Sequence, residues 1–173
     1  QKFSYDLLFD DSIKFVSLIG KAGSGKTLMA IAAGMEQTLS LKKSNNKYRK
    51  IVVSRPVQPL GKDIGFLPGT MHEKMLPWLM PIQDNLETIM GEDKSYLDEY
   101  VTRGKIQIEA LTYIRGRSIN NAFIVIDEAQ NLTAHEVKTI LTRVGENTKI
   151  VLTGDVEQID NVYTNETSNG LAY

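Results

Sequence analysis

The chain contains no cysteine, so disulfide bonds and thiolate metal sites are excluded. This absence is typical of a reducing compartment and favours the cytoplasm. No apolar run approaches the ~18 residues that a membrane-spanning helix needs, and no signal peptide is visible, so we expect no membrane partner. The 20 basic and 21 acidic residues give a net charge of −1. Any site for a polyanion must therefore be a local patch.

The length of 173 residues is that of one ordinary domain with a sizeable core. The chain starts at Gln1 rather than at methionine and stops at Tyr173 in a polar stretch. We therefore expect residues 1–173 to be a single domain and a C-terminally truncated piece of a longer protein. The two histidines, His72 and His135, have no ligand partners at metal-binding spacing, which favours structural or surface roles.

A glycine-rich segment after an apolar run is the strongest signal in the chain. The segment fits the pattern G-x-x-x-x-G-K-[ST] and consists of Gly20, Lys21, Ala22, Gly23, Ser24, Gly25, Lys26 and Thr27. Its glycines let successive backbone N–H groups point at phosphate oxygens, and the helix predicted from residue 27 adds a favourable dipole. Lys26 supplies a positive charge, and the Thr27 hydroxyl is a ligand for Mg²⁺. The segment predicts a nucleotide site.

Apolar and β-branched runs alternate with helical patterns along the rest of the chain. We predict strands at residues 15–19, 50–54, 105–111, 122–126 and 149–153. Because the strands are almost continuously apolar and alternate with helices, they favour an α/β fold, in which a parallel sheet has helices on both faces.

Three further patterns concern helices and loops. Residues 71–90 have helical spacing, but Pro77 and Pro81 each remove a backbone donor, so we expect broken or kinked helices there. Another helix is predicted at residues 93–101. Residues 133–136 form a capping box that should open a helix ending at Gly145. Residues 55–70 hold three prolines and three glycines and are interpreted as an extended functional loop.

A pair of acids follows the strand at residues 122–126. Ligands bind at the carboxyl ends of parallel strands, so Asp127 and Lys26 should meet in one crevice. Side chains alternate along a strand, which lets the two acids take different roles. We expect Asp127 to hold Mg²⁺ through water and Glu128 to polarise the water that attacks the γ-phosphate.

Other classes of nucleotide-dependent protein fit less well. A GTPase needs an Asn-Lys-x-Asp guanine-binding motif, whereas Asn46-Lys47 is followed by Tyr48-Arg49. Transport ATPases carry a Leu-Ser-Gly-Gly-Gln-like signature, which is absent from residues 1–173. A small-molecule kinase remains an open alternative, because a phosphate loop does not define which molecule accepts the phosphoryl group. The adjacent acids at 127 and 128 favour water as the acceptor.

A third motif follows the strand at residues 149–153. If this strand lies between those that carry the phosphate loop and Asp127, a polar group at its tip can contact the γ-phosphate. Thr153 or Asp155 would then sense hydrolysis, and Gln158 would relay it.

Together these residues resemble the PhoH family of ATPases. The resemblance covers nearly the whole chain and rests on six ordered segments, at residues 20–27, 54–56, 63–69, 113–117, 127–131 and 153–160. It implies a RecA-like P-loop NTPase core related to superfamily 1 helicases, ATP hydrolysis and action on RNA. It also implies a fused PIN-type or separate endoribonuclease and hexameric rings. Gln1 matches by position a glutamine that binds adenine in related helicases.

The resemblance leaves two features of the site open. PhoH-like domains continue into arginines near the γ-phosphate, which residues 161–173 do not contain, and a missing arginine finger costs about 10³ to 10⁵ in rate. Single-stranded RNA binders use basic grooves. The candidates for such contacts are Arg55, Lys62, Arg115 and Arg117, and Arg55 suits a phosphate of either ATP or RNA.

The sequence thus favours an Mg²⁺-dependent ATPase coupled to RNA remodelling or unwinding. Its rival is a nucleotide-regulated assembly module, which binds ATP to organise a ring or recruit a nuclease and turns it over negligibly. ATP turnover with and without single-stranded RNA separates the two.

Overall fold

The computed structural model describes residues 2–42, 44, 46–56, 71–91, 94–114 and 118–172. One five-stranded sheet has the order β1-β5-β4-β2-β3, and all its pairings are parallel. Its strands are β1 (Phe15–Ile19), β2 (Lys50–Arg55), β3 (Ile106–Ala110), β4 (Ala122–Ile126) and β5 (Lys149–Gly154). The α/β class is confirmed, and β5 lies between β1 and β4.

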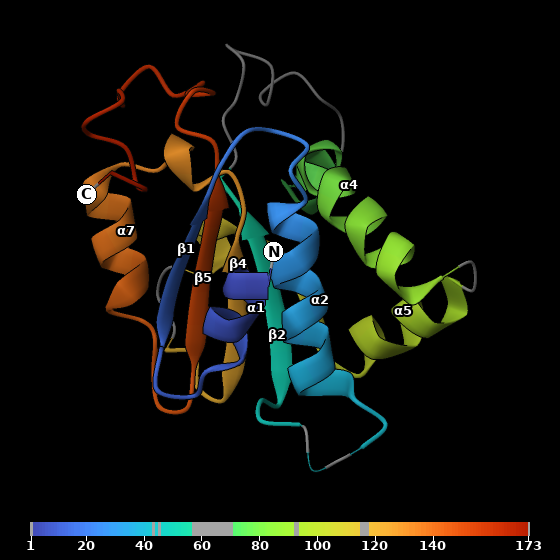
Figure 1. Ribbon diagram of the computed structural model, residues 1–173. Helices are drawn as coiled ribbons and strands as arrows, with labels where there is room; N and C mark the ends of the chain where they lie inside the picture. Colours follow the sequence, from blue (N-terminus) through green and yellow to red (C-terminus); the bar gives the residue numbers. More distant parts are fainter. Residues whose placement is uncertain are drawn as a thin grey trace.

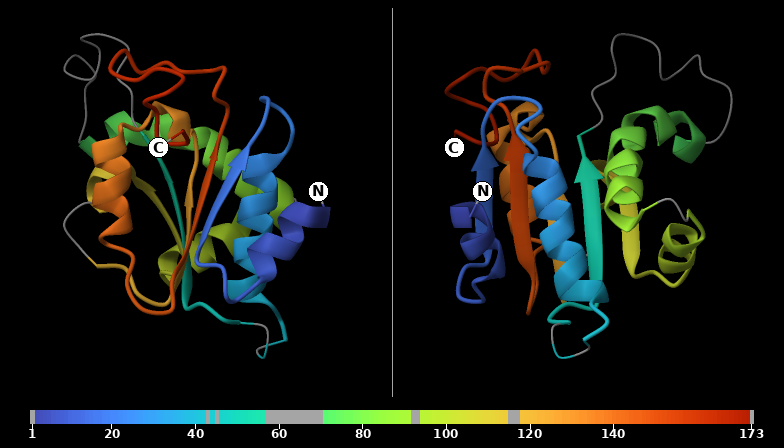
Figure 2. Two further views of the ribbon diagram at one scale, coloured as in Figure 1. Left: turned by 60° about the vertical axis from the view of Figure 1, so that its left-hand side comes forward. Right: turned by 45° about the vertical axis from the view of Figure 1, so that its right-hand side comes forward.

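Helices cover both faces of the sheet, as expected (Figures 1 and 2). One face carries α1 (Lys2–Phe9), α2 (Lys26–Leu39), α4 (Met71–Met90) and α5 (Lys94–Thr102). The other carries α6 (Leu111–Ile114), the 3-10 helix η2 (Ala129–Asn131) and α7 (Ala134–Leu141). Within the described part of the chain, no helix has the length and apolar character needed to cross a bilayer.

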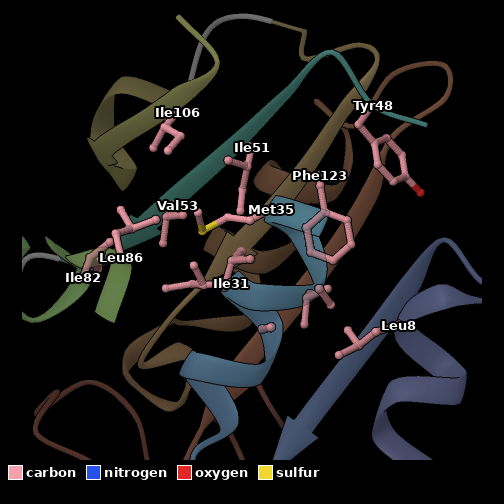
Figure 3. Close-up of a cluster of buried hydrophobic side chains, with 14 of the residues drawn as sticks. Leu8, Ile31, Met35, Tyr48, Ile51, Val53, Ile82, Leu86, Ile106 and Phe123 are labelled. Atoms are coloured by element: carbon pink, nitrogen blue, oxygen red, sulfur yellow. The ribbon is translucent and has the colours of Figure 1, made fainter. Parts of the chain in front are cut away.

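The larger hydrophobic core lies between the sheet and α2 (Figure 3). Ile31 of α2 and Phe123 of β4 are fully buried there. Gly34 lets α2 approach closely, because a Cβ at this position would lie 2.6 Å from Ile51 Cδ1 and 2.7 Å from Phe123 Cδ1. This packing fixes α2, and with it the phosphate loop, against the centre of the sheet.

Of the two expectations for residues 71–90, a broken or a kinked helix, the break is wrong, since α4 is a single helix with both prolines inside it. Each proline costs about 3 kcal/mol in a helix interior. Burial of Leu79, Ile82 and Leu86 opposes that cost, with roughly 1.5–3 kcal/mol for each side chain. Packing on the sheet therefore offsets the two missing backbone donors.

The capping box that opens α7 is confirmed, since Thr133 Oγ1 accepts from the Glu136 amide and the Glu136 carboxylate accepts from the Thr133 amide. The predicted end at Gly145 is wrong, because α7 ends at Leu141. Residues 143–145 instead pair with Ile119, whose carbonyl accepts from the Gly145 amide at 2.9 Å. Glycine is needed there for close approach to residues 119 and 120 rather than for a helix end.

The sequence patterns above assign no helix to residues 2–9, where the structure has α1. A buried lysine at the start of β5 holds the end of this helix. Lys149 Nζ donates to the carbonyl oxygens of Leu7, Leu8 and Asp10 at 3.2, 2.7 and 2.8 Å. A cation suits the negative end of a helix. Lys149 therefore fastens α1 to the sheet.

We expect Lys149→Met to destabilise the fold by about 2 kcal/mol, because the carbonyl groups at the end of α1 lose their charged donor. Urea unfolding measures the free energy. Lys14→Met, the same substitution at an exposed position, is the control. Equal stability of the two variants would contradict the role of Lys149.

Candidate nucleotide site

The phosphate loop joins β1 to α2 at the carboxyl edge of the sheet (Figure 1). The Gly20 amide donates to the Gly154 carbonyl at 3.2 Å, which anchors the loop to the end of β5. Gly23 and Gly25 have φ angles of 74° and 81°, in the left-handed region that glycine adopts readily. α2 begins at Lys26, so the first N–H groups of this helix border the loop. The backbone has the form of an anion cradle.

Lys26 lies inside this cradle. Its Nζ donates to the carbonyl oxygens of Gly20 and Lys21, both at 2.7 Å, and to Ser24 Oγ at 3.3 Å. The ammonium group is thus placed among the loop residues, where it would neutralise phosphate charge.

A second cluster joins α2 to the ends of β4 and β5. Asp127 Oδ1 accepts from Thr27 Oγ1 and from Thr153 Oγ1, each at 2.7 Å. The two hydroxyls lie 3.5 Å apart. A carboxylate and a hydroxyl are the oxygen donors that Mg²⁺ takes together with substrate phosphates. Thr27 and Asp127 therefore fit a magnesium ion.

Glu128 lies beside this cluster in a constrained conformation. Its φ angle of 54° is left-handed, which costs a non-glycine residue roughly 1–2 kcal/mol. Among the described residues, the other non-glycine residues with positive φ are Asn121 and Asn147, and asparagine tolerates that region well. A glutamate does so only when its surroundings hold it there, and such strain is typical of functional sites.

Two side chains hold the Glu128 carboxylate. Arg55 Nη2, at the end of β2, donates to Oε1 at 3.1 Å. Gln130 Nε2 donates to Oε2. Arg55, predicted to bind a phosphate, is thus ion-paired with the candidate base.

Gln130 is a site residue that the sequence reasoning missed. Its side chain is fully buried; its Nε2 also donates to the Gln158 carbonyl at 2.9 Å, and its Oε1 accepts from the Asp155 amide at 3.2 Å. A Cβ at Gly154 would lie 2.3 Å from that Oε1, so glycine makes room for the contact. Gln130 links Glu128 to residues 155–158.

Asp155 connects the same segment to the phosphate loop. Its carboxylate accepts from the Glu157 amide at 3.0 Å and from the Ala22 amide at 2.7 Å. The backbone hydrogen bond from Glu157, the one from Ala22 and the charge of Lys26 hold the pKa of Asp155 below its usual value. The ionised carboxylate thus sits on one N–H group of the loop.

A pocket of about 350 Å³ opens between these groups. The structure brings most of the predicted nucleotide-binding residues to its wall, and it adds Leu28 and Asn85. The lining residues are Ala22, Gly23, Gly25, Lys26, Thr27, Leu28, Asn85, Asp127, Glu128, Gly154, Asp155 and Gln158.

Some predicted contacts cannot be placed. Gln1, Lys62, Arg115 and Arg117 lie outside the described residues, as does most of the predicted loop at residues 55–70. Asn46 and Lys47 precede β2 at the opposite edge of the sheet from the phosphate loop (Figure 1). A base bound beside that loop is out of their reach, which argues further against the GTPase interpretation.

The parallel sheet, the glycine-rich cradle and the carboxylates at the strand ends define a P-loop nucleotide-binding protein. The PhoH-like protein family model matches residues 1–173, and the chain belongs to this family. It is similar to Protein PhoH2 of Bacillus subtilis, with 58% identity over 100% of this chain and 39% of that protein. It is also similar to Protein PhoH2 of Mycolicibacterium smegmatis, with 43% identity over 94% of this chain and 36% of that protein.

The chain spans about two fifths of the length of these curated relatives. Among solved structures, it is similar to the Sulfolobus solfataricus SWI2/SNF2 ATPase core in complex with dsDNA, with a TM-score of 0.53 and 19% identity. The match covers 98% of this chain and 34% of that one. It supports the RecA-like fold.

The lowered pKa of Asp155 makes a contribution to stability that depends on pH. Its ionised form stabilises the fold above the ordinary value of 3.8, and this contribution is lost as the pH falls through the lower folded-state pKa. We expect Asp155→Asn to lower the urea midpoint at neutral pH and to approach the wild type in acid, where Asp155 becomes neutral. Asp98→Asn, at an exposed position, is the control. A deficit that is equal at both pH values would contradict this role.

Proposed function

We propose that the chain is an Mg²⁺-dependent ATPase domain whose turnover is coupled to RNA remodelling or unwinding, with single-stranded RNA as its partner, in a protein that assists a ribonuclease. The observation that carries the proposal is the pair Asp127 and Glu128 beside the phosphate loop. Asp127 contacts Thr27, and Glu128 lines the same pocket as Lys26.

The geometry supports a division of roles. The N–H groups of residues 23–27 and the Lys26 ammonium would bind the phosphates. Thr27 and Asp127 would hold Mg²⁺, which supplies charge neutralisation on the phosphates when it is bound. Glu128 would take a proton from the attacking water. Asp155 and Gln158 also line the pocket and are joined to Glu128 through Gln130.

The RNA part of the proposal rests on the family resemblance and on Arg55 at the carboxyl edge of the sheet. A cation at the end of β2, next to the acid that would activate water, can link nucleic-acid binding to hydrolysis. A PIN-type or separate endoribonuclease and a ring-shaped homo-oligomer belong to the same proposal.

We expect Glu128→Gln to lower kcat for ATP by about 10²- to 10⁴-fold and to leave KM nearly unchanged, because the base is lost while the phosphate cradle remains. Steady-state hydrolysis by the full-length protein measures this. Glu146→Gln, at an exposed position, should retain wild-type turnover. Wild-type turnover by Glu128→Gln would rule out the assigned base.

We expect single-stranded RNA to raise ATP turnover if the domain works on RNA. A labelled oligouridylate is a suitable probe because it forms little secondary structure. Turnover that RNA does not change, together with oligomerisation that requires ATP, would instead support an assembly module.

A further inference from the structure

The Glu128 carboxylate has a hydrogen-bond donor on each oxygen. Arg55 Nη2 lies 3.1 Å from Oε1, and Gln130 Nε2 donates to Oε2. The two donors fix the direction in which the carboxylate points, and Arg55 occupies the oxygen, Oε1, that is not held by the buried glutamine. Arg55 therefore restrains the group that the proposed function needs.

The two donors are held very differently. Gln130 is fully buried and makes hydrogen bonds to three other residues of the site. The ion pair has one Nη2 contact to one oxygen, and its side chains are 24% and 28% exposed. Partly exposed pairs of this kind are weak. Arg55 is thus the donor that a competing anion can remove, while Gln130 keeps Oε2 in place.

A phosphate group is the competitor that best suits Arg55, since a guanidinium binds phosphate through two parallel N–H groups. Glu128 lines the nucleotide pocket, whereas Arg55 is not among the described residues that line it. In the sheet order, β2, which ends at Arg55, lies on the side of β4 away from β1 and the phosphate loop. A phosphate that reaches it from that side belongs to a second ligand, and a nucleic-acid backbone supplies such phosphates.

We propose that Arg55 is a positioning residue that restrains Glu128 until a phosphate of single-stranded RNA draws its guanidinium away. This inference rests on the proposed function. Once Arg55 has moved, Glu128 Oε1 accepts a proton from water, and the water oxygen forms the new bond to the γ-phosphorus. The bond to the bridging oxygen breaks, and ADP leaves with that electron pair. Arg55 thereby couples RNA binding to hydrolysis.

The first test measures affinity and needs no turnover. If RNA and Glu128 compete for Arg55, Glu128→Gln should bind a fluorescein-labelled oligouridylate about fivefold more tightly than the wild type, at the lower end of typical coupling between sites. Fluorescence anisotropy of the full-length protein, with Mg²⁺ and a non-hydrolysable ATP analogue, gives the Kd. Glu99→Gln, on α5, removes the same charge from a pair with Arg103 and should leave the Kd unchanged.

A double-mutant cycle separates competition from simple charge repulsion. In the Arg55→Ala background, adding Glu128→Gln should leave the RNA affinity unchanged, because the residue for which the ligands compete is gone. If the double variant binds RNA more tightly than Arg55→Ala does, Glu128 acts only by repelling RNA, and this result would overturn the inference.

The second test measures turnover. Arg55→Ala should hydrolyse ATP faster than the wild type without RNA and should gain little when RNA is added. Arg55→Gln, which keeps a polar side chain, should show the same turnover as Arg55→Ala and replaces it in this test if Arg55→Ala does not fold. Basal turnover that falls, or stimulation by RNA equal to the wild type, would overturn the restraint.

The outcomes distinguish this inference from the proposed function. A wild-type protein that hydrolyses ATP but neither binds RNA nor responds to it would overturn both the RNA part of the proposed function and the inference. If RNA stimulates ATP turnover by the wild type but Glu128→Gln binds RNA no more tightly than the wild type, the inference alone would be overturned.

Discussion

The site depends on the hydrogen bonds that Asp127 Oδ1 accepts from Thr27 and Thr153. These three side chains come from the end of β4, the start of α2 and the end of β5. They meet only because β5 lies between β1 and β4 in a parallel sheet, so that all the strands end at one edge. A change in strand order would separate the phosphate loop from the acids. The fold thus fixes the relative positions of cradle and carboxylates.

A second polar network holds the candidate base. Gln130 joins Glu128 to Asp155 and Gln158, and Asp155 in turn contacts Ala22 in the phosphate loop. Gln130 and Asp155 are buried, so a missing partner for either side chain would be costly. The network explains how Glu128 can keep a strained backbone conformation. It also connects the phosphate loop to Glu128 through contiguous contacts.

Local patterns were sufficient to predict the elements that carry the site. The glycine-rich loop, the strand before Asp127 and the capping box depend on neighbouring residues, and the structure has each of them where it was expected. Tertiary packing decided the features that were missed. α4 stays continuous through Pro77 and Pro81 because its apolar side chains are buried on the sheet, and α7 ends early because residues 143–145 pair with Ile119.

The partners of Arg55 and Gln130 could not be predicted from the sequence for a related reason. An arginine after a strand suits a phosphate as well as a carboxylate, and only the pairing of β2 with β4 brings it to Glu128. Gln130 follows the two acids closely, but its other partners lie more than twenty residues away. Such contacts depend on the register of the sheet rather than on any short motif.

The central claim is that one edge of this sheet binds the nucleotide and presents Glu128 to the attacking water. A crystal structure of the full-length protein with Mg²⁺, ADP and aluminium fluoride, which mimics the transferring phosphoryl group, tests it most directly. We expect the phosphates on the N–H groups of residues 23–27, Mg²⁺ on Thr27, and the axial water within hydrogen-bond distance of Glu128. A nucleotide bound elsewhere, or an axial water held by another residue with Glu128 turned away, would contradict it.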